Sequence, residues 1–424
     1  MRTPTARVPG LALLAAGFVA VLAAPAAAQT DPVTVVVRAA RVLDGTGNDL
    51  GPRDVVVRGE AIERISPMGT EGGVVYDLGD VTLMPGFIDT HVHIGWHFDR
   101  ATGKTHTDRN ESGEDAALYA ASNAWVTLQG GVTTVQSLGA MVDLPLRDAI
   151  GKGAVPGPRI LTSGSAVTAG TGDEAAIRAH VARMADAGVD VIKIFASASI
   201  RDGGGPTLSQ EQLDAACGEA KARGLRSFVH AYDPESVRRV VAAGCTGVEH
   251  GALLDRPTLE LMARKGVYLD PNIDLVMRNY FENAERYIGV GNYSEEGFAQ
   301  MRAAQPKALA VFQEGLKVPG LKMVFGTDAV AGSHGRNLEE LVYRIRAGGQ
   351  DPMDAITSAT SLAAEELGLW DVTGRIAPNM AADLVAVAGD ALGDPSALLR
   401  PVFVMKGGRV YRNDSVGMPN PHPR

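Results

Sequence analysis

The feature that most constrains this chain is an alternation between short β-rich apolar runs and stretches of helical periodicity, which continues from Val81 to about Lys322. This alternation is typical of parallel βα units. Eight such strands close a (β/α)8 barrel, the TIM barrel, so an α/β protein of that architecture is predicted. The predicted strands are Leu83–Asp89, Val132–Gln136, Arg159–Thr162, Val191–Ile194, Phe228–His230, Gly247–His250, Val267–Asp270 and Lys322–Thr327. Predicted helices between them include Asp173–Ala187, Ser209–Arg223 and Pro234–Ala243, and two connections are unusually long, Gly95–Glu114 and Pro271–Gln300.

Both ends of the chain carry further short strands, for example Val33–Val37 and Leu384–Val387. Strands this short cannot bury their own faces, so the two sets are expected to pair into one small composite β-sandwich. The predicted organisation is a sandwich from residues 29–82 plus 375–424, and a (β/α)8 barrel from residues 83–374.

The first 28 residues have the pattern of a secretory signal peptide. Arg2 and Arg7 precede an apolar run, Leu11–Ala24, which ends in small residues near Ala28. The run is shorter than the roughly 20 residues that span a bilayer. Cleavage after Ala28 is therefore expected, with the mature protein periplasmic or secreted and without a membrane contact; an uncleaved anchor is the alternative.

The charge of the chain indicates a small-molecule substrate and not nucleic acid. The full chain has 40 basic and 49 acidic residues, and removing two Arg leaves 38 against 49, or −11. A protein that binds the nucleic-acid backbone is normally basic.

The two cysteines are interpreted as buried small side chains without a catalytic role. Cys217 lies in an alanine-rich helical pattern and Cys245 in a small-residue turn. An oxidising compartment permits disulfides, so a Cys217–Cys245 bridge is kept as the alternative.

Ligand-type side chains end several of the predicted strands. The carboxyl ends of barrel strands meet at one face, where barrel active sites form, so these groups are expected to converge. Imidazole and carboxylate without thiolate suit Zn²⁺ and, less well, Mn²⁺, Co²⁺ or Fe²⁺. The groups are His91, His93, His230, His250 and Asp328.

Lys193, on the fourth predicted strand, would face the same point as an ammonium ion. It either pairs with a nearby acid or solvent, or it is carbamylated by CO₂, which would turn the cation into a bridging carboxylate. Composition does not distinguish the two.

Together these motifs resemble the amidohydrolase superfamily, and within it the imidazolonepropionase-like branch, which includes Xaa-Pro and Xaa-Arg dipeptidases and ochratoxinase. The resemblance covers nearly the whole mature chain. It rests on Met84–His93, Gly131–Val135, Val191–Ile194, His230–Tyr232, Gly247–Gly251, Gly326–Asp328, Gly374–Ile376 and Ala382–Leu384.

The resemblance implies two zinc ions. His91, His93 and Asp328 would hold the more buried ion, His230 and His250 the more exposed one, and carbamylated Lys193 would bridge them. Two cations lower the pKa of a shared water toward about 7, and Asp328 would act as general base and acid. The resemblance further implies that Tyr232 meets the substrate carboxylate or the oxyanion, and that the protein is a homo-oligomer, with an octamer as one form.

The expected reaction is hydrolysis of the amide bond between an acyl group and a C-terminal amino acid, including ochratoxin A hydrolysis to phenylalanine and ochratoxin alpha. Two departures from the branch affect the choice of substrate: Gln136-Ser137 replaces Arg-Asp, and Ala169–Asp173 lacks a Gly-Gly-His. The alternative functions are a cyclic amidohydrolase of the imidazolonepropionase or hydantoinase type, and a periplasmic metal- or peptide-binding protein without turnover.

Further candidates for substrate binding, beside Tyr232, are Trp96, His97, Arg278 and His334.

Overall fold

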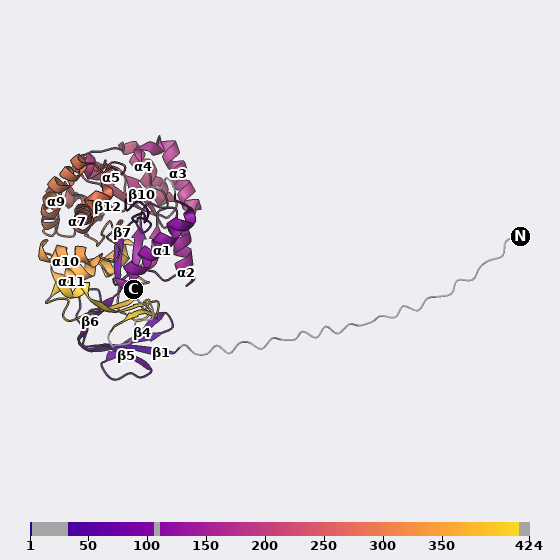
Figure 1. The fold of residues 1–424 in the computed structure, drawn as a ribbon, viewed down its shortest axis with the longest axis vertical. Coiled ribbons are helices and arrows are strands. Elements are labelled where there is room, and N and C mark those ends of the chain that lie inside the picture. The colour runs from indigo at the N-terminus through magenta and orange to yellow at the C-terminus, as the bar shows by residue number, and fades with distance from the viewer. Residues whose placement is uncertain (2–32, 106–110, 415–424) are drawn as a thin grey trace. The chain divides into compact units, whose positions relative to one another are not determined.

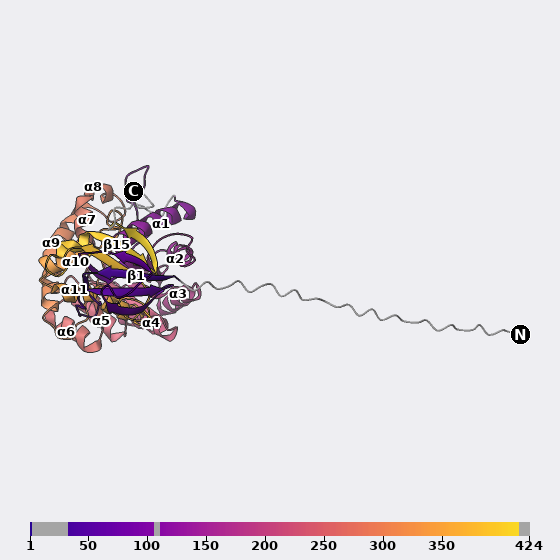
Figure 2. The ribbon, with the colours of Figure 1, turned by 90° about the horizontal axis from the view of Figure 1, so that it is seen from below.

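The computed structural model describes Met1, residues 33–105 and residues 111–414. The predicted signal peptide, residues 1–28, lies outside these ranges apart from Met1, so it stays a prediction. The chain from Val33 onward has an α/β fold, in which helices surround the strands (Figures 1 and 2).

Seven of the eight predicted parallel strands are present, in two sheets. Long β-branched and apolar runs form them, and these runs are buried on both faces, as parallel strands between helices usually are. The first sheet holds β7 (Phe87–Val92), β8 (Val132–Ser137) and β9 (Arg159–Thr162). The second sheet holds β10 (Val191–Phe195), β11 (Arg226–Ala231), β12 (Gly247–His250) and β13 (Tyr268–Asp270).

The eighth predicted strand, Lys322–Thr327, is not a regular strand, which corrects the prediction. It forms one parallel bridge to β13, between Leu269 and Met323. The backbone N–H of Thr90 in β7 also donates to the carbonyl of Phe325 at 2.9 Å. Beyond that point the N–H groups of Thr327 and Asp328 both donate to the His91 carbonyl, so the regular ladder of a strand cannot continue.

A second correction concerns the predicted strand Leu83–Asp89, which is two strands separated at Gly86. The first, β6 (Val81–Pro85), pairs antiparallel with β14 (Leu384–Ala388) in another sheet. The second, β7, pairs parallel with β8. The chain therefore changes sheets inside one apolar run, and hydrophobicity alone does not mark such a change.

The three predicted helices are confirmed, because their capping residues bind the first turn as expected. Asp173 accepts a hydrogen bond from the N–H of Ala176, and Ser209 accepts one from the N–H of Gln212. No helix in the described ranges is long and apolar enough to cross a bilayer. The helices of the first half are α1 (Gly113–Gln129), α2 (Asp143–Gly151), α3 (Glu174–Asp186), α4 (Gln210–Ala222), α5 (Pro234–Ala242) and α6 (Arg256–Lys265).

The long connection predicted at Pro271–Gln300 is largely helical. Aromatic side chains of this segment pack into the core, including Tyr280, Tyr287 and Phe298. Burial of those rings explains why the segment folds into helices and not into an exposed loop. The helices of the second half are α7 (Leu275–Glu282), α8 (Ala284–Tyr287), α9 (Glu295–Gly315), α10 (Leu338–Arg346), α11 (Pro352–Ser358) and α12 (Ser361–Glu366), and the short 3₁₀ turns are η1 (Ala169–Thr171), η2 (Ile200–Asp202) and η3 (Pro395–Leu399).

The end strands form two sheets. One sheet has the order β4-β3-β1-β5 and comes entirely from the N-terminal part, whereas the other has the order β16-β15-β14-β6-β2 and mixes both ends (Figure 2). Apolar side chains from the two sheets, among them Val37, Val57 and Phe403, share one core. The remaining bounds are β1 (Thr34–Ala39), β2 (Arg41–Val42), β3 (Arg53–Arg58), β4 (Ala61–Pro67), β5 (Val74–Asp77), β15 (Pro401–Lys406) and β16 (Arg409–Asn413).

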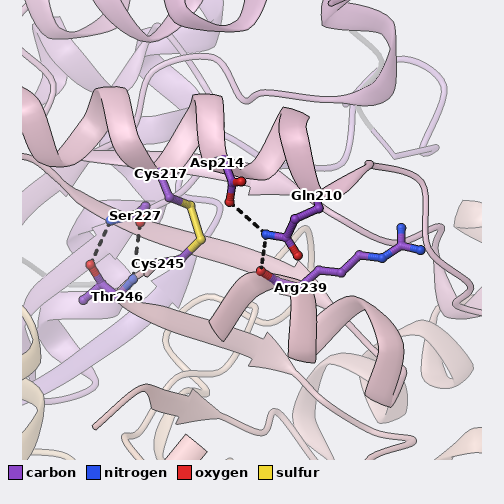
Figure 3. Close-up of a disulfide and its surroundings, with 7 residues drawn as sticks. All are labelled: Gln210, Asp214, Cys217, Ser227, Arg239, Cys245 and Thr246. Atoms are coloured by element: carbon purple, nitrogen blue, oxygen red, sulfur yellow. Dashed lines mark hydrogen bonds between the residues drawn. A yellow bond between two sulfur atoms is a disulfide. The ribbon is translucent and has the colours of Figure 1, made fainter. Parts of the chain in front are cut away.

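Cys217 and Cys245 form a disulfide, which corrects the interpretation that they are separate packing residues (Figure 3). Cys217 is on α4, and Cys245 is in the turn between α5 and β12. Gln210 donates to the carbonyl of Arg239 at 3.1 Å and so joins α4 to α5 (Figure 3). The two elements therefore lie side by side, with Cα atoms 5.2 Å apart, a separation that a disulfide can span.

Replacing both cysteines with alanine is expected to lower the free energy of unfolding by about 3–4 kcal/mol, because the bridge restricts a loop with a sequence separation of 28 in the unfolded chain. Urea unfolding of the wild type and of C217A/C245A, followed by circular dichroism, measures the difference. Wild type treated with dithiothreitol is the control and should match the double variant. Two free thiols per chain in the untreated, denatured wild type would contradict the bridge.

Candidate metal centre

Six predicted ligand groups line one cavity of about 270 Å³. They come from strands that are far apart in the sequence, and each group lies at or near the carboxyl end of its strand, where barrel proteins gather functional side chains. His91 is in β7 and His93 directly follows it, while Lys193 is in β10. The others are His230 in β11, His250 at the end of β12, and Asp328 after the segment 322–327.

Imidazoles lie close to one another and to one carboxylate in this cavity. The Oδ1 atom of Asp328 is 3.0 Å from Nε2 of His93 and 3.4 Å from Nε2 of His91. The rings of His230 and His250 are 4.6 Å apart, and the His91 ring is 5.4 Å from that of His250. His91, His93 and Asp328 each offer a ligand atom within 4.8 Å of the others, which is close enough to share one ion.

The electrostatics of the cavity prepare these groups for cation binding. Burial lowers the pKa of His91, His230 and His250, and Lys193 lowers each further, so the three imidazoles are neutral and can donate electron pairs. Burial alone would raise the pKa of Asp328, but His91 and His93 hold that pKa below its usual range. Asp328 is therefore a carboxylate.

Several buried atoms of the described residues have no hydrogen-bond partner, and four of them lie at the ligand cluster. These four are both ring nitrogens of His91, Nε2 of His230 and Oε1 of Glu249. Buried polar atoms are normally satisfied, so a cluster of unsatisfied imidazole nitrogens in one cavity indicates a missing ligand. A divalent metal ion suits this set, because imidazole and carboxylate are its common ligands and sulfur is absent from the group.

A deeper layer of carboxylates positions the ligand groups. Oδ2 of Asp270 is 3.5 Å from Nδ1 of His91, and Asp270 itself accepts from Asn272 at 3.1 Å and pairs with the buried Arg344 at 3.4 Å. A Cβ atom at Gly326 would lie 2.0 Å from Asp270 Oδ2, so only glycine admits this arrangement. Carboxylates of this kind commonly orient metal-binding histidines.

Asp89 ties the first ligand strand to the segment that carries Asp328. Its carboxylate accepts hydrogen bonds from the Thr327 hydroxyl at 2.7 Å and from the Asn337 amide at 2.7 Å. It also accepts one from the backbone N–H of His91 at 3.1 Å. Burial raises the pKa of Asp89 to about 7, against these donors, which lower it.

Sequence reasoning missed Glu249, a fully buried carboxylate whose Oε2 contacts Nζ of Lys193 and is 3.6 Å from Nε2 of His91. Neighbouring residues of a regular strand point to opposite faces. If His250 is a ligand, a regular strand would therefore point Glu249 away from the ligand cluster. His250 has a positive φ of 71°, which breaks that alternation. A left-handed residue at the end of a strand is not visible in the sequence pattern.

The predicted substrate-binding residues fall into two groups. Trp96 and Tyr232 line the cavity, and the ring of Tyr232 stacks on His250 at 4.8 Å. The other three are not among the described residues that line it, and each is engaged elsewhere. His97 pairs with Glu111 at 2.9 Å, Arg278 forms ion pairs with Asp274, Glu282 and Glu339, and His334 contacts the Trp96 carbonyl at 2.9 Å.

Part of the lining was not predicted at all. Arg201, Asn292 and Tyr293 face the same cavity from η2 and from the turn before α9. The one signal in the sequence is the glycine-rich stretch 202–205 after the fourth strand, which indicates a turn at the carboxyl end of that strand.

Comparisons with known proteins agree with this geometry. The model of the amidohydrolase family matches residues 82–411. Ochratoxinase from Aspergillus niger is 26% identical over 379 residues, which cover 79% of this chain and 76% of that protein. Its crystal structure, with a TM-score of 0.76 and 21% identity, covers 91% of this chain and 96% of its own and supports the fold alone.

Two other solved structures are similar over 90% of this chain and 100% of their own. One is a Xaa-Pro dipeptidase with bound methionine in the active site, with a TM-score of 0.81 and 29% identity. The other is a prolidase complexed with N-methylphosphonate-L-proline, with a TM-score of 0.79 and 26% identity. These family neighbours imply a TIM-barrel α/β fold. The chain belongs to the amidohydrolase family and is a hydrolase that acts on carbon–nitrogen bonds.

Proposed function

We propose that this protein hydrolyses the amide bond between an acyl group and the nitrogen of a C-terminal amino acid, as a dipeptidase or carboxypeptidase does. The observation that carries the proposal is the convergence of six ligand groups and Tyr232 on one cavity. The similar structures named for Xaa-Pro dipeptidase and prolidase support a substrate of this class. Ochratoxin A, an amide of phenylalanine, is included because ochratoxinase is among the relatives.

The proposed cofactor is a pair of divalent cations, Zn²⁺ first and Mn²⁺, Co²⁺ or Fe²⁺ as alternatives. His91, His93 and Asp328 would hold one ion, and His230 and His250 the other. When bound, such a pair supplies an acidified water as nucleophile and polarises the scissile carbonyl. The unsatisfied nitrogens of His91 and His230 support this assignment.

Lys193 is proposed to be carbamylated and to bridge the two ions. Its side chain is fully buried and lies near three imidazoles, where an ammonium ion would repel divalent cations. Attack of the neutral amine on CO₂ forms an N–C bond, releases one proton and leaves a carboxylate. The cation at the centre of the cavity thus becomes the anion that two metal ions require.

The remaining chemistry is assigned to three side chains. Asp328, a carboxylate in contact with His93, would accept a proton as the nucleophile attacks and return it to the leaving amine. Burial raises the pKa of Tyr232, so its hydroxyl stays protonated and can donate a hydrogen bond to the substrate carboxylate or to the oxyanion. Trp96 would form part of the wall that excludes water.

The architecture proposed for this function is a closed (β/α)8 barrel of residues 83–374 and a composite β-sandwich of residues 29–82 plus 375–424. Backbone bonds between neighbouring strands support closure, such as Asp190 to Thr162 at 2.8 Å and Leu269 to Lys322 at 2.9 Å. The disulfide supports a periplasmic or secreted location. A homo-oligomer, such as an octamer, completes the proposal.

Metal analysis tests the bridged site directly. Purified protein is expected to hold two divalent ions per chain, and K193A is expected to lose at least one ion together with its activity, because the bridging group is gone. Plasma mass spectrometry and an amide hydrolysis assay measure both quantities. K406A is the matched control, since Lys406 is a half-buried lysine that binds the Gly157 carbonyl instead of the ligand cluster. One tightly bound ion per wild-type chain would favour the cyclic amidohydrolase.

The D328N variant is expected to lower kcat for N-acyl amino acids by about 10²–10⁴-fold, because the amide cannot accept the proton. The thermal unfolding midpoint should change by only a few degrees, because asparagine has nearly the same shape and volume as aspartate. D214N, at an exposed position of α4, is the control and should keep full activity. A wild-type rate in D328N would overturn the mechanism, and no turnover by the metal-loaded wild type across a broad dipeptide panel would revive the binding-protein alternative.

A further inference from the structure

Arg201 brings a guanidinium to the wall of the ligand cavity. It lies in η2, the 3₁₀ turn that follows β10, and it is the only arginine among the described residues that line this cavity. Apart from Lys193, the described lining contains no other permanently cationic side chain. The position of a lone guanidinium in a substrate cavity calls for a chemical explanation, because burying a charge without a partner is costly.

The contacts of Arg201 are neutral. Its Nε and one terminal nitrogen donate to the Asn292 side-chain oxygen at 3.3 and 3.2 Å. The guanidinium lies 4.1 Å from the centre of the Tyr293 ring and 5.8 Å from that of Tyr280. Aromatic faces stabilise a cation without neutralising it. Among the residues that the structure describes, no carboxylate forms an ion pair with Arg201, whereas Arg278 has three such partners.

The surroundings of Arg201 hold it beside Tyr232 and the ligand cluster. Gly204 has a φ of 73°, and a Cβ atom there would lie 3.0 Å from Cβ of Tyr232, so the glycine-rich turn packs directly on that tyrosine. The ring of Tyr232 stacks on that of His250 at 4.8 Å, and Tyr232 and Arg201 line the same cavity. Tyr232 therefore contacts the ligand cluster on one side and the glycine-rich turn that follows Arg201 on the other.

The geometry points to Arg201 as the group that anchors the carboxylate of the C-terminal amino acid released by hydrolysis, with the Tyr232 hydroxyl as a second donor. A guanidinium and a carboxylate form two parallel hydrogen bonds, which fix the orientation of the substrate as well as its charge. This assignment rests on the proposed function, and it makes Arg201 a specificity-determining residue for that reaction.

The same wall defines the side chain of the released amino acid. Val276, Met277 and Val330 line the cavity, and so does Met301, which is one turn after the point where α9 contacts Arg201 at Gly297. The only described acidic residue in the lining is Asp328, which belongs to the ligand cluster. A lysine or arginine side chain would find no carboxylate partner in the described lining apart from that ligand group. The released amino acid is therefore neutral and apolar, such as leucine, methionine or phenylalanine.

The experiment compares two substrates that differ only in the anchored group, N-acetyl-L-phenylalanine and its C-terminal carboxamide, by measuring release of phenylalanine or phenylalaninamide. The wild type should prefer the acid. R201Q should lower kcat/KM for the acid by about 30–100-fold, mainly through KM, and leave that for the carboxamide nearly unchanged. R201K should retain part of the preference because it keeps the charge. R278Q is the control and should behave as wild type.

Each remaining outcome decides the question. Equal losses on both substrates in R201Q would assign Arg201 a structural role, and a shift of the acid preference in R278Q alone would assign the anchor to Arg278. Faster release of lysine than of phenylalanine from N-acetyl amino acids would refute the apolar subsite. If the wild type hydrolysed neither substrate, the proposed reaction would fail, and calorimetric binding of N-acetyl-L-phenylalanine to wild type and R201Q would still test the anchor.

Discussion

Charge balance inside the ligand cavity governs how its side chains can be arranged, because water does not reach most of them. The imidazoles of His91 and His93 lie against the Asp328 carboxylate, and Glu249 lies against Lys193. Below them Asp270 pairs with Arg344, a fully buried guanidinium. A buried charge is tolerated only when opposite charges and hydrogen bonds surround it, so each of these buried carboxylates lies against a cation or an imidazole.

Backbone conformation contributes a second constraint at the same place. His250 and Asp328 both have a positive φ, 71° and 52°, which costs about 1–3 kcal/mol for a residue other than glycine. Neighbouring bonds hold the strained residues in place: the N–H of Asp328 donates to the His91 carbonyl at 2.7 Å. The strain turns the chain sharply after the last strand residue, so that Asp328 points back over the cavity instead of away from it. Strain of this kind is concentrated where a protein does its chemistry.

The sequence predicted the elements that repeat and missed those that deviate from a repeat. Parallel strands such as β9 and β12 were found with correct bounds, because a continuous apolar run is a local signal. Two features that interrupt the strand pattern were missed. One is Gly86, where a single apolar run is divided between two sheets. The other is Glu249, which contacts Lys193 from the position next to the ligand His250. Arg201 was missed for a different reason. Its role depends on whether a carboxylate lies beside it, and its actual neighbours, such as Asn292, come from segments about 90 residues away in the sequence.

Gln136 lies away from the cavity, although the sequence connects it with the choice of substrate. Gln136 is one of the two departures from the branch that this chain resembles, and an effect on the choice of substrate is predicted from it. The structure instead places Gln136 inside the strands, where it donates to the Thr90 carbonyl and accepts from Arg226, which also pairs with the buried Glu366. Gln136 is not among the described residues that line the cavity. Gln136 therefore belongs to the packing beneath the ligand groups, whereas the cavity is lined by residues of η2 and of the helices that follow β13.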